Sequence, residues 1–166
     1  MISFEQALSE LLSLAKQLES EMASIEDASG RILASDAIAT HNQPPFDASA
    51  MDGYALKKSD KLPNKKLSVI GRVAAGGSFD GSVNKNQAVR IFTGAPLPAG
   101  ADSVLIQEDA EVSEDNIVIN DNIDANDYIR KKGDDYKKGE VLLKRGKTLK
   151  SFDIALLASM NFPMVN

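Results

Sequence analysis

Turn-forming residues divide the middle of the chain into short apolar runs, and this spacing limits the possible folds more than any other feature. Glycine, proline and asparagine recur between runs that are rich in valine, isoleucine and leucine. Such runs, bounded by turn residues, are typical of β-strands. We expect strands at 51–56, 66–73, 88–92, 103–107 and 116–119, with shorter ones at 32–34, 36–39 and 141–143. Many short strands at this spacing predict an antiparallel barrel or sandwich.

The start of the chain has a helical pattern instead. Ser3 and Gln6 have the spacing of a capping box, in which each residue bonds the backbone amide of the other. Apolar residues then recur at helical intervals as far as Met22. The pattern predicts an amphipathic helix over 4–22.

The end of the chain also contains a helix and strands. The run 152–160 predicts a short helix with Ser151 as its N-cap and Asn161 as a left-handed residue after its end. The last residues, from Phe162, have the pattern of a strand that begins there, which indicates a piece of a longer protein.

These patterns predict an α+β, mainly β, fold. An antiparallel β-barrel or sandwich-like domain, residues 41–139, would be inserted into a small domain made of residues 1–40 and 140–166. The small domain would contain the N-terminal helix and the C-terminal strand and helix segment.

Composition excludes several kinds of site. The chain has no cysteine and a single histidine, His41, so disulfides, thiolate chemistry and histidine-based metal sites are excluded or hard to build. The net charge of −5 argues against nucleic-acid binding. No apolar run approaches the roughly 20 residues of a membrane span, and no signal peptide is present, so we expect a cytoplasmic protein without a membrane partner.

Three loops carry residues suited to chemistry. The loop 46–54 holds Asp47, Ser49 and Asp52 among small neighbours, and its carboxylates either bind a ligand or bond local amides in a turn. The turn at Thr93-Gly94 either presents a hydroxyl and amides to an oxyanion or is a proline-stiffened connection. The loop 130–135 is either a hydrated Mg²⁺ site or a charged turn.

At these loops the sequence resembles the molybdopterin molybdenumtransferase family, whose animal relative is the E domain of gephyrin. The matching segments follow the order of the family and cover nearly the whole chain. They are 46–55 (FDASAMDGYA), 71–76 (GRVAAG), 89–98 (VRIFTGAPLP), 107–108 (QE), 129–135 (IRKKGDD) and 154–159 (IALLAS). The family usually has asparagine where Ala48 stands, which removes one side-chain contact.

The resemblance implies an activity that belongs to a longer protein. Members insert molybdate into adenylylated molybdopterin, with Mg²⁺, and release AMP. They are homodimers, and the active cleft lies between the β-rich domain of one subunit and a molybdopterin-binding domain of the other.

The resemblance also implies site residues. It points to Asp52, Thr93 and Asp135 as catalytic residues, with Asp52 and Asp135 positioning the metal. Ser49, Gly94 and Glu108 are the substrate-binding candidates, and Thr93 and the Gly94 amide would contact oxyanion or phosphate oxygens.

A second hypothesis is a non-catalytic β-rich module for binding or dimerisation. The amphipathic first helix favours it, and we expect the 166-residue chain alone to turn over no substrate.

Overall fold

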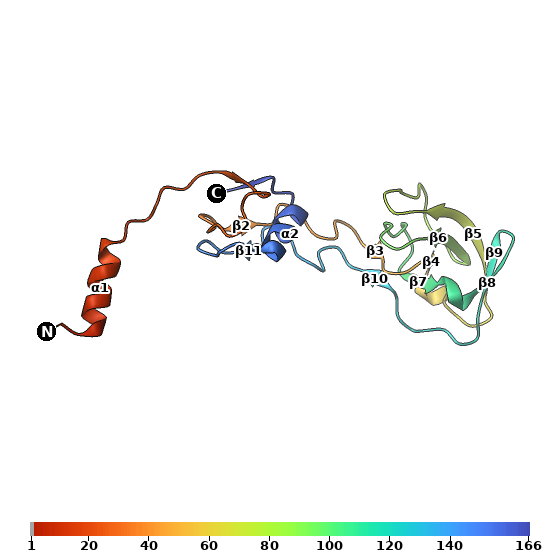
Figure 1. Cartoon of the computed structure of the whole chain (residues 1–166). Helices are drawn as coiled ribbons and strands as arrows, with labels where there is room; N and C mark the ends of the chain where they lie inside the picture. Colours follow the sequence, from red (N-terminus) through yellow and green to blue (C-terminus); the bar gives the residue numbers. More distant parts are fainter. Residues whose placement is uncertain (1) are drawn as a thin grey trace. The chain divides into compact units, whose positions relative to one another are not determined.

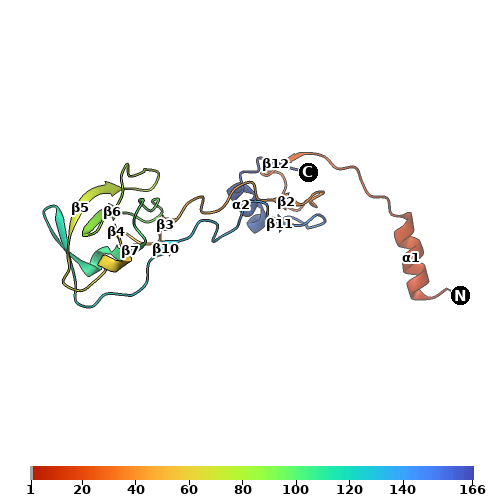
Figure 2. The same ribbon diagram turned by 180° about the vertical axis from the view of Figure 1, so that it is seen from behind.

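The computed structural model describes residues 2–166 and shows a mainly β chain with two α-helices among those residues (Figures 1 and 2). The chain forms two compact units. The first consists of the chain up to Ile38 together with Val141–Asn166, and the second of Ala39–Glu140. The second unit is therefore inserted into the first.

A curled six-stranded sheet forms most of the second unit. Its strands are β4 (Gly53–Leu56), β5 (Lys66–Val73), β6 (Gln87–Ile91), β7 (Ser103–Ile106), β8 (Ala110–Ser113) and β9 (Asn116–Ile119). They lie in the order β7-β4-β6-β5-β9-β8. Two 3-10 turns, η1 (Lys58–Asp60) and η2 (Gln107–Asp109), follow β4 and β7.

One pair of strands departs from the expected antiparallel arrangement. β5 and β6 are parallel, while the other neighbours in the sheet are antiparallel. A parallel pair needs a long connection to return the chain to the same end of the sheet. The 13 residues 74–86 between β5 and β6 provide that length.

Each face of the sheet carries its own apolar cluster. One contains Tyr54, Leu56, Leu67, Ala88, Leu105, Ile117 and Ile119. The other contains Ala55, Val73, Val83, Val89, Ile91, Ala95 and Val104. Aliphatic residues dominate both, as the low aromatic content requires, and alternate residues of β4 and β6 supply the two faces.

A short ladder completes the second unit. β3 (Ala48–Ser49) pairs antiparallel with β10 (Ile129–Arg130), and an isolated bridge joins Gln43 and Tyr136 further along the same two chain segments.

The described residues of the first unit contain two small strand pairs and both helices. β1 (Ala23–Ser24) pairs with β12 (Met164–Val165), and β2 (Ala37–Ile38) pairs with β11 (Val141–Leu143). The strand predicted to begin near Phe162 is confirmed by β12. The strand predicted at 32–34 is wrong, because only an isolated bridge between Ile32 and Thr148 forms there.

The first helix, α1 (Phe4–Leu14), is shorter than predicted. The capping box is present: the Ser3 hydroxyl accepts from the Gln6 amide at 3.2 Å, and the Gln6 side chain accepts from the Ser3 amide at 3.1 Å. Residues 15–22, predicted as helix, have no regular structure. No α1 residue is buried, so no tertiary packing supports a longer helix.

The second helix, α2 (Ser151–Ser159), begins one residue earlier than predicted. Lys150 is the N-cap residue, and the Asp153 carboxylate accepts from its backbone amide at 2.9 Å. The cap therefore comes from inside the helix, and Ser151 is not the cap. Asn161 has a φ of 62°, which confirms the left-handed residue predicted after the helix. Neither helix is long and apolar enough to cross a membrane, among the residues that the structure describes.

Candidate functional site

Hydrogen bonds join Asp52 and Thr93 directly. Asp52 Oδ1 accepts from the Thr93 amide at 2.8 Å and from the Thr93 hydroxyl at 2.9 Å. β4 and β6 are antiparallel neighbours with Gly53 opposite Ile91, so the start of β4 lies beside the end of β6. The sheet therefore brings together two candidates that come from separate loops.

These contacts hold the pKa of the Asp52 carboxyl group below its ordinary value of 3.8. The hydrogen bond from the Thr93 amide lowers its pKa most, followed by the bond from the Thr93 hydroxyl. Partial burial acts in the opposite direction, and the positive charge of Arg90 lowers the pKa further. Asp52 is thus suited to accept hydrogen bonds or to face a cation, and unsuited to donate a proton.

β3 holds the same turn from the other side. The Gly94 amide donates to the Ser49 carbonyl at 2.9 Å, and the Ser49 amide donates to the Ala95 carbonyl at 3.0 Å. Ser49 is 1% exposed, and its hydroxyl donates to the Met51 carbonyl at 2.6 Å. Ser49 and Gly94 therefore stabilise the turn, and their polar hydrogens are engaged within the protein.

The Thr93 hydroxyl has a similar restriction. A hydroxyl carries one donor hydrogen and two acceptor lone pairs. Thr93 uses that hydrogen on Asp52, so in this conformation it can accept from a ligand but cannot also donate to an oxyanion. The oxyanion contact expected of Thr93 and the Gly94 amide would require the turn to rearrange.

A close backbone approach explains the glycine after Asp52. A Cβ atom placed on Gly53 would lie 1.9 Å from the Leu105 carbonyl oxygen of the neighbouring strand β7. Only glycine permits this approach. Gly53 thereby fixes where β4 begins and where Asp52 leaves the sheet.

Glu108 lies next to this group through η2. The Gln107 amide donates to the Asp52 carbonyl at 3.0 Å, and the Gln107 side chain donates to Glu108 Oε1 at 3.1 Å. Asp52, Thr93, Ser49, Gly94 and Glu108 thus form one connected group, which we call the Asp52 cluster.

Asp135 is bonded elsewhere. Both of its carboxylate oxygens accept from Arg130 Nη2, at 2.7 and 2.8 Å, and its amide donates to the Gln43 carbonyl at 2.8 Å. Among residues 2–166, no hydrogen bond joins Asp135 to Asp52. Arg130 belongs to β10, which pairs with Ser49 and Ala48 of β3, so that ladder connects the two carboxylates.

Asp47 has a structural role beside the same ladder. Its carboxylate accepts from Lys131 Nζ and from the Lys132 amide, each at 2.9 Å. The Lys132 amide lowers the pKa of Asp47 most, and the Lys131 side chain adds to the effect. The Lys131 amide in turn donates to Asp134 at 2.6 Å, so the loop 130–135 has the bonds of a charged turn.

Arg90 is a residue that the sequence analysis did not select. Its guanidinium donates from Nη1 to the Gly53 carbonyl at 3.1 Å and from Nη2 to Gln107 Oε1 at 2.5 Å. It also lies over the rings of Tyr54 and Phe92. A charged residue inside the apolar run 88–92 was the available signal, since such a residue has to find partners on neighbouring strands.

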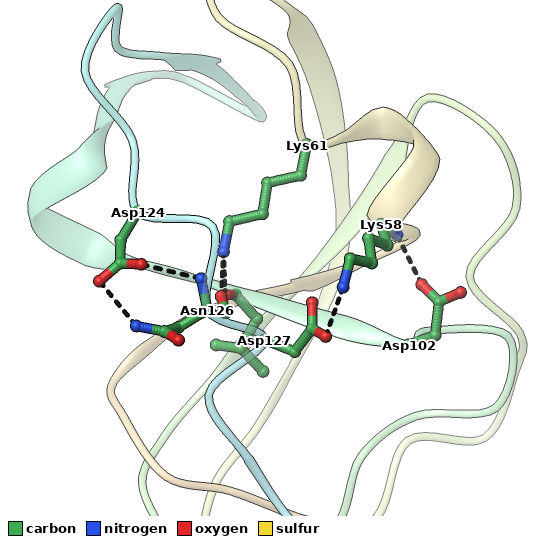
Figure 3. A network of polar contacts seen from close by, with 7 residues as sticks. Lys58, Lys61, Asp102, Asp124, Asn126 and Asp127 are labelled. Atoms are coloured by element: carbon green, nitrogen blue, oxygen red, sulfur yellow. Dashed lines mark hydrogen bonds and ion pairs between the residues drawn. The ribbon is translucent and has the colours of Figure 1, made fainter.

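A second polar network lies at the other end of β4 (Figure 3). Lys61 is buried, and its ammonium donates to the carbonyls of Val104 and Asn126. Burial lowers the pKa of Lys61, while Asp127 and Asp124 act in the opposite direction. Lys58 donates from Nζ to Asp127 at 2.7 Å. The network fastens the segment 124–127 to the sheet and contains none of the candidate residues.

The residues present do not form a magnesium site by themselves. Within residues 2–166 no group of three or more histidine, aspartate or glutamate side chains could hold a metal ion. Both Asp135 oxygens are bonded to Arg130, whereas the bonds made by Asp52 use Oδ1. Asp52 Oδ2 could supply one ligand, and the others would have to come from substrate and water.

A cavity of about 560 Å³ lies in the first unit. Residues 17–21 and 30–34 line it together with Leu149 and Val165. None of the candidate residues lies there, so the cavity does not bear on the Asp52 cluster.

Comparison with known proteins decides the family. Residues 2–161 match the family model described as MoeA N-terminal region (domain I and II). The chain belongs to this family. Among curated relatives of this MoeA-family chain, the molybdopterin molybdenumtransferase of Haemophilus influenzae is 40% identical over 167 residues, which cover 99% of the chain and 41% of the relative. The Bacillus subtilis molybdopterin molybdenumtransferase is 34% identical, with 99% and 40% covered.

A solved MoeA structure has the same fold. The molybdopterin biosynthesis MoeA protein of Pyrococcus horikoshii superimposes with a TM-score of 0.89 at 32% identity, over 99% of this chain and 45% of that one. The MoeA-family chain thus spans about two fifths of the length of the curated relatives that it matches.

Proposed function

We propose that the chain is the N-terminal part of a molybdopterin molybdenumtransferase of molybdenum cofactor biosynthesis. The reaction is insertion of molybdate into adenylylated molybdopterin with release of AMP. The family match over residues 2–161 carries this proposal. The direct bonding of Asp52 to Thr93 supports it, because it gives the matched segments a common location.

The Asp52 cluster would form one side of the active site. Thr93 holds the Asp52 carboxylate through two hydrogen bonds, which leaves Oδ2 to face a cation or water. The Glu108 carboxylate accepts from the Gln107 side chain, and the backbone bonds between Ser49 and the Gly94 turn fix the surrounding backbone. Asp135 would contribute from the β3–β10 ladder, and to bind a ligand it would have to leave Arg130.

Magnesium enters this proposal through Asp52. A bound Mg²⁺ ion would screen the negative charges of molybdate and of the adenylylated pterin. Mg²⁺ commonly takes one or two protein carboxylates and fills its other positions with substrate oxygens and water, which fits the single open oxygen of Asp52.

The remaining parts of the proposal concern the whole protein. A molybdopterin-binding domain of a second subunit would complete the cleft, so the active form would be a homodimer. The proposed compartment of this homodimer is the cytoplasm. The 166-residue chain alone would bind but not turn over substrate.

Activity of the full-length protein tests the proposal. Asp52→Ala and Thr93→Ala should each lower molybdate insertion into adenylylated molybdopterin by about 100-fold, the usual scale for a lost positioning contact. Glu111→Gln, an exposed acidic residue on β8, is the matched control and should retain full activity. Unchanged insertion in both variants, with folding intact, would show that the Asp52 cluster is not the site.

One observation favours the alternative of a binding or dimerisation module. The helix α1 has an apolar face and buries none of its residues. Its partner in this alternative is a second copy of the chain.

A further inference from the structure

Three side chains form a row across the sheet next to the Asp52 cluster. Tyr54 of β4 lies opposite Arg90 of β6, and Arg90 lies opposite Arg72 of β5. Residues that lie opposite each other on paired strands project from the same face. Phe92 is two residues after Arg90 and therefore shares that face.

Phe92 binds both guanidinium groups. The Arg72 guanidinium lies 4.7 Å from the centre of the Phe92 ring, and that of Arg90 lies 4.8 Å from it. Arg90 also lies 5.0 Å from the centre of the Tyr54 ring. Stacking on a ring holds a guanidinium in place while its edge stays open to hydrogen bonding.

The two arginine side chains differ in whether their hydrogen-bond donors have acceptors within the protein. Arg90 donates to Gly53 and Gln107 and is half-buried. Arg72 is exposed, and its guanidinium makes no hydrogen bond or ion pair with any residue from 2 to 166. The protein thus fixes Arg90 and leaves the donors of Arg72 available.

Among the described residues, neither guanidinium forms an ion pair with a carboxylate. Asp52 is the carboxylate whose pKa Arg90 lowers, and it is already bonded to Thr93. Glu108 likewise accepts from the Gln107 side chain, to which Arg90 donates, so both carboxylates of the Asp52 cluster already have donors within the protein.

Further donors lie beside Arg72. The loop that follows β5 reaches the Thr93 turn, since a Cβ atom on Gly94 would be 3.9 Å from the Ala75 side chain. In the described part of the chain, the exposed amides of Ala75, Gly76 and Ser78 have no backbone acceptor. Exposed amides next to a guanidinium are the donors that proteins use for phosphate and related anions.

We propose that Arg72, which the Phe92 ring holds in place beside Arg90, binds a tetrahedral oxyanion at the end of β5. The inference deepens the proposed function, and rests on it for the identity of the anion: the phosphate of the adenylylated pterin or molybdate itself. Oxyanion binding thus falls to Arg72 and the loop 74–78, because the Thr93 and Gly94 donors are engaged within the turn.

Anion titration of the 166-residue chain tests the inference. Amide chemical shifts are followed by NMR while sodium phosphate, or in a second arm sodium molybdate, is added at constant ionic strength. We expect saturable shifts in residues 72–78 and 93–95, and binding roughly tenfold weaker in Arg72→Gln, the scale of one lost charge-assisted hydrogen bond.

Two further variants make the test specific. Lys66→Gln removes an exposed positive charge from the other end of β5 and should change the affinity less than about twofold. Arg72→Lys keeps the charge and should restore part of the affinity. The anion that binds with the lower Kd, phosphate or molybdate, is the one that the site prefers. Equal affinity in Arg72→Gln and the unchanged chain, or equal losses in Arg72→Gln and Lys66→Gln, would overturn the inference.

The full-length protein separates this inference from the proposed function. Arg72-dependent anion binding without any molybdate insertion would refute the function and leave the inference standing. Molybdate insertion that depends on Asp52, with anion binding and KM unchanged by Arg72→Gln, would refute the inference alone.

Discussion

Asp60 shows how a single buried charge holds the second unit together. Its side chain is 1% exposed and accepts from Lys65 Nζ at 2.6 Å and from the Asn86 amide at 2.7 Å. Burial alone would raise the pKa of Asp60, but the bonds from Lys65 and Asn86 outweigh it and the pKa is lowered. Asp60 thus joins η1 to the residue before β5 and to the end of the long connection before β6.

Asp60→Asn should destabilise the chain in a pH-dependent way. The lowered pKa means that the folded state binds this proton less tightly than the unfolded state, so the stabilisation is complete above the ordinary value of 3.8. It is lost as the pH falls below 3.8 towards the folded-state pKa. We expect a loss of about 2 kcal/mol at pH 7 by urea unfolding, shrinking at pH values below 3.8.

Asp80→Asn is the control for this measurement. Asp80 is an exposed residue in the loop between β5 and β6 and should unfold like the unchanged chain at every pH. A difference between Asp60→Asn and the unchanged chain that is equal at pH 7 and pH 3 would contradict the assigned pKa shift.

At the scale of elements, the pairing of β4 with β7 depends on Gly53. The Leu105 carbonyl oxygen occupies the place of a Cβ atom, so Gly53→Ala must move one of the two strands. Such overpacking costs about 1–3 kcal/mol, and we expect a loss of this size in thermal or urea unfolding. The amide shifts of Gln107 and Thr93 should change as well, because Asp52 connects them.

Gly76→Ala provides the comparison for Gly53→Ala. A Cβ atom on Gly76 meets nothing within 4 Å, and only its φ of +80° opposes alanine, at a cost of about 1 kcal/mol. If the two variants lost the same stability and shifted the same amides, the close approach at Gly53 would not explain the glycine.

The strands that could be predicted are those that their own residues and the flanking turn residues define. β5 and β11 have the predicted bounds because turn residues enclose an alternating run in β5 and a continuous apolar run in β11. β8 was missed because it is an edge strand of four residues whose one large apolar side chain, Val112, is exposed. The parallel pairing of β5 with β6 was missed because strand order follows from the whole sheet and no local pattern encodes it.

The same limit applies to the candidate site. Asp52 and Thr93 were selected separately, and only the β4–β6 register shows that they touch. Arg90 was missed because its partners, Tyr54, Phe92 and Gln107, come from β4, the end of β6 and η2. When the partners of a residue come from three elements, the residues next to it in the sequence do not indicate its role.

At the scale of the molecule, α1 is the element that the fold does not use. It has 11 residues, none of them buried, and isolated helices of about that length are marginal in water. Phe4, Leu8, Leu11 and Leu12 share its apolar face, and all are exposed. An apolar face of this kind is characteristic of a surface that binds another protein.

We expect the 166-residue chain to self-associate through this face. Leu8→Glu combined with Leu11→Glu places two charges on the face and should convert a dimer into a monomer in sedimentation experiments. Ser9→Glu combined with Ser13→Glu adds the same charge to the opposite side of the helix and should leave the dimer intact. The amide shifts of the β-sheet should be the same in all three proteins, because the sheet lies in the other compact unit. A chain that sediments as a monomer before any substitution would show that α1 does not mediate dimerisation, and the homodimer of the proposed function would then have to use other surfaces.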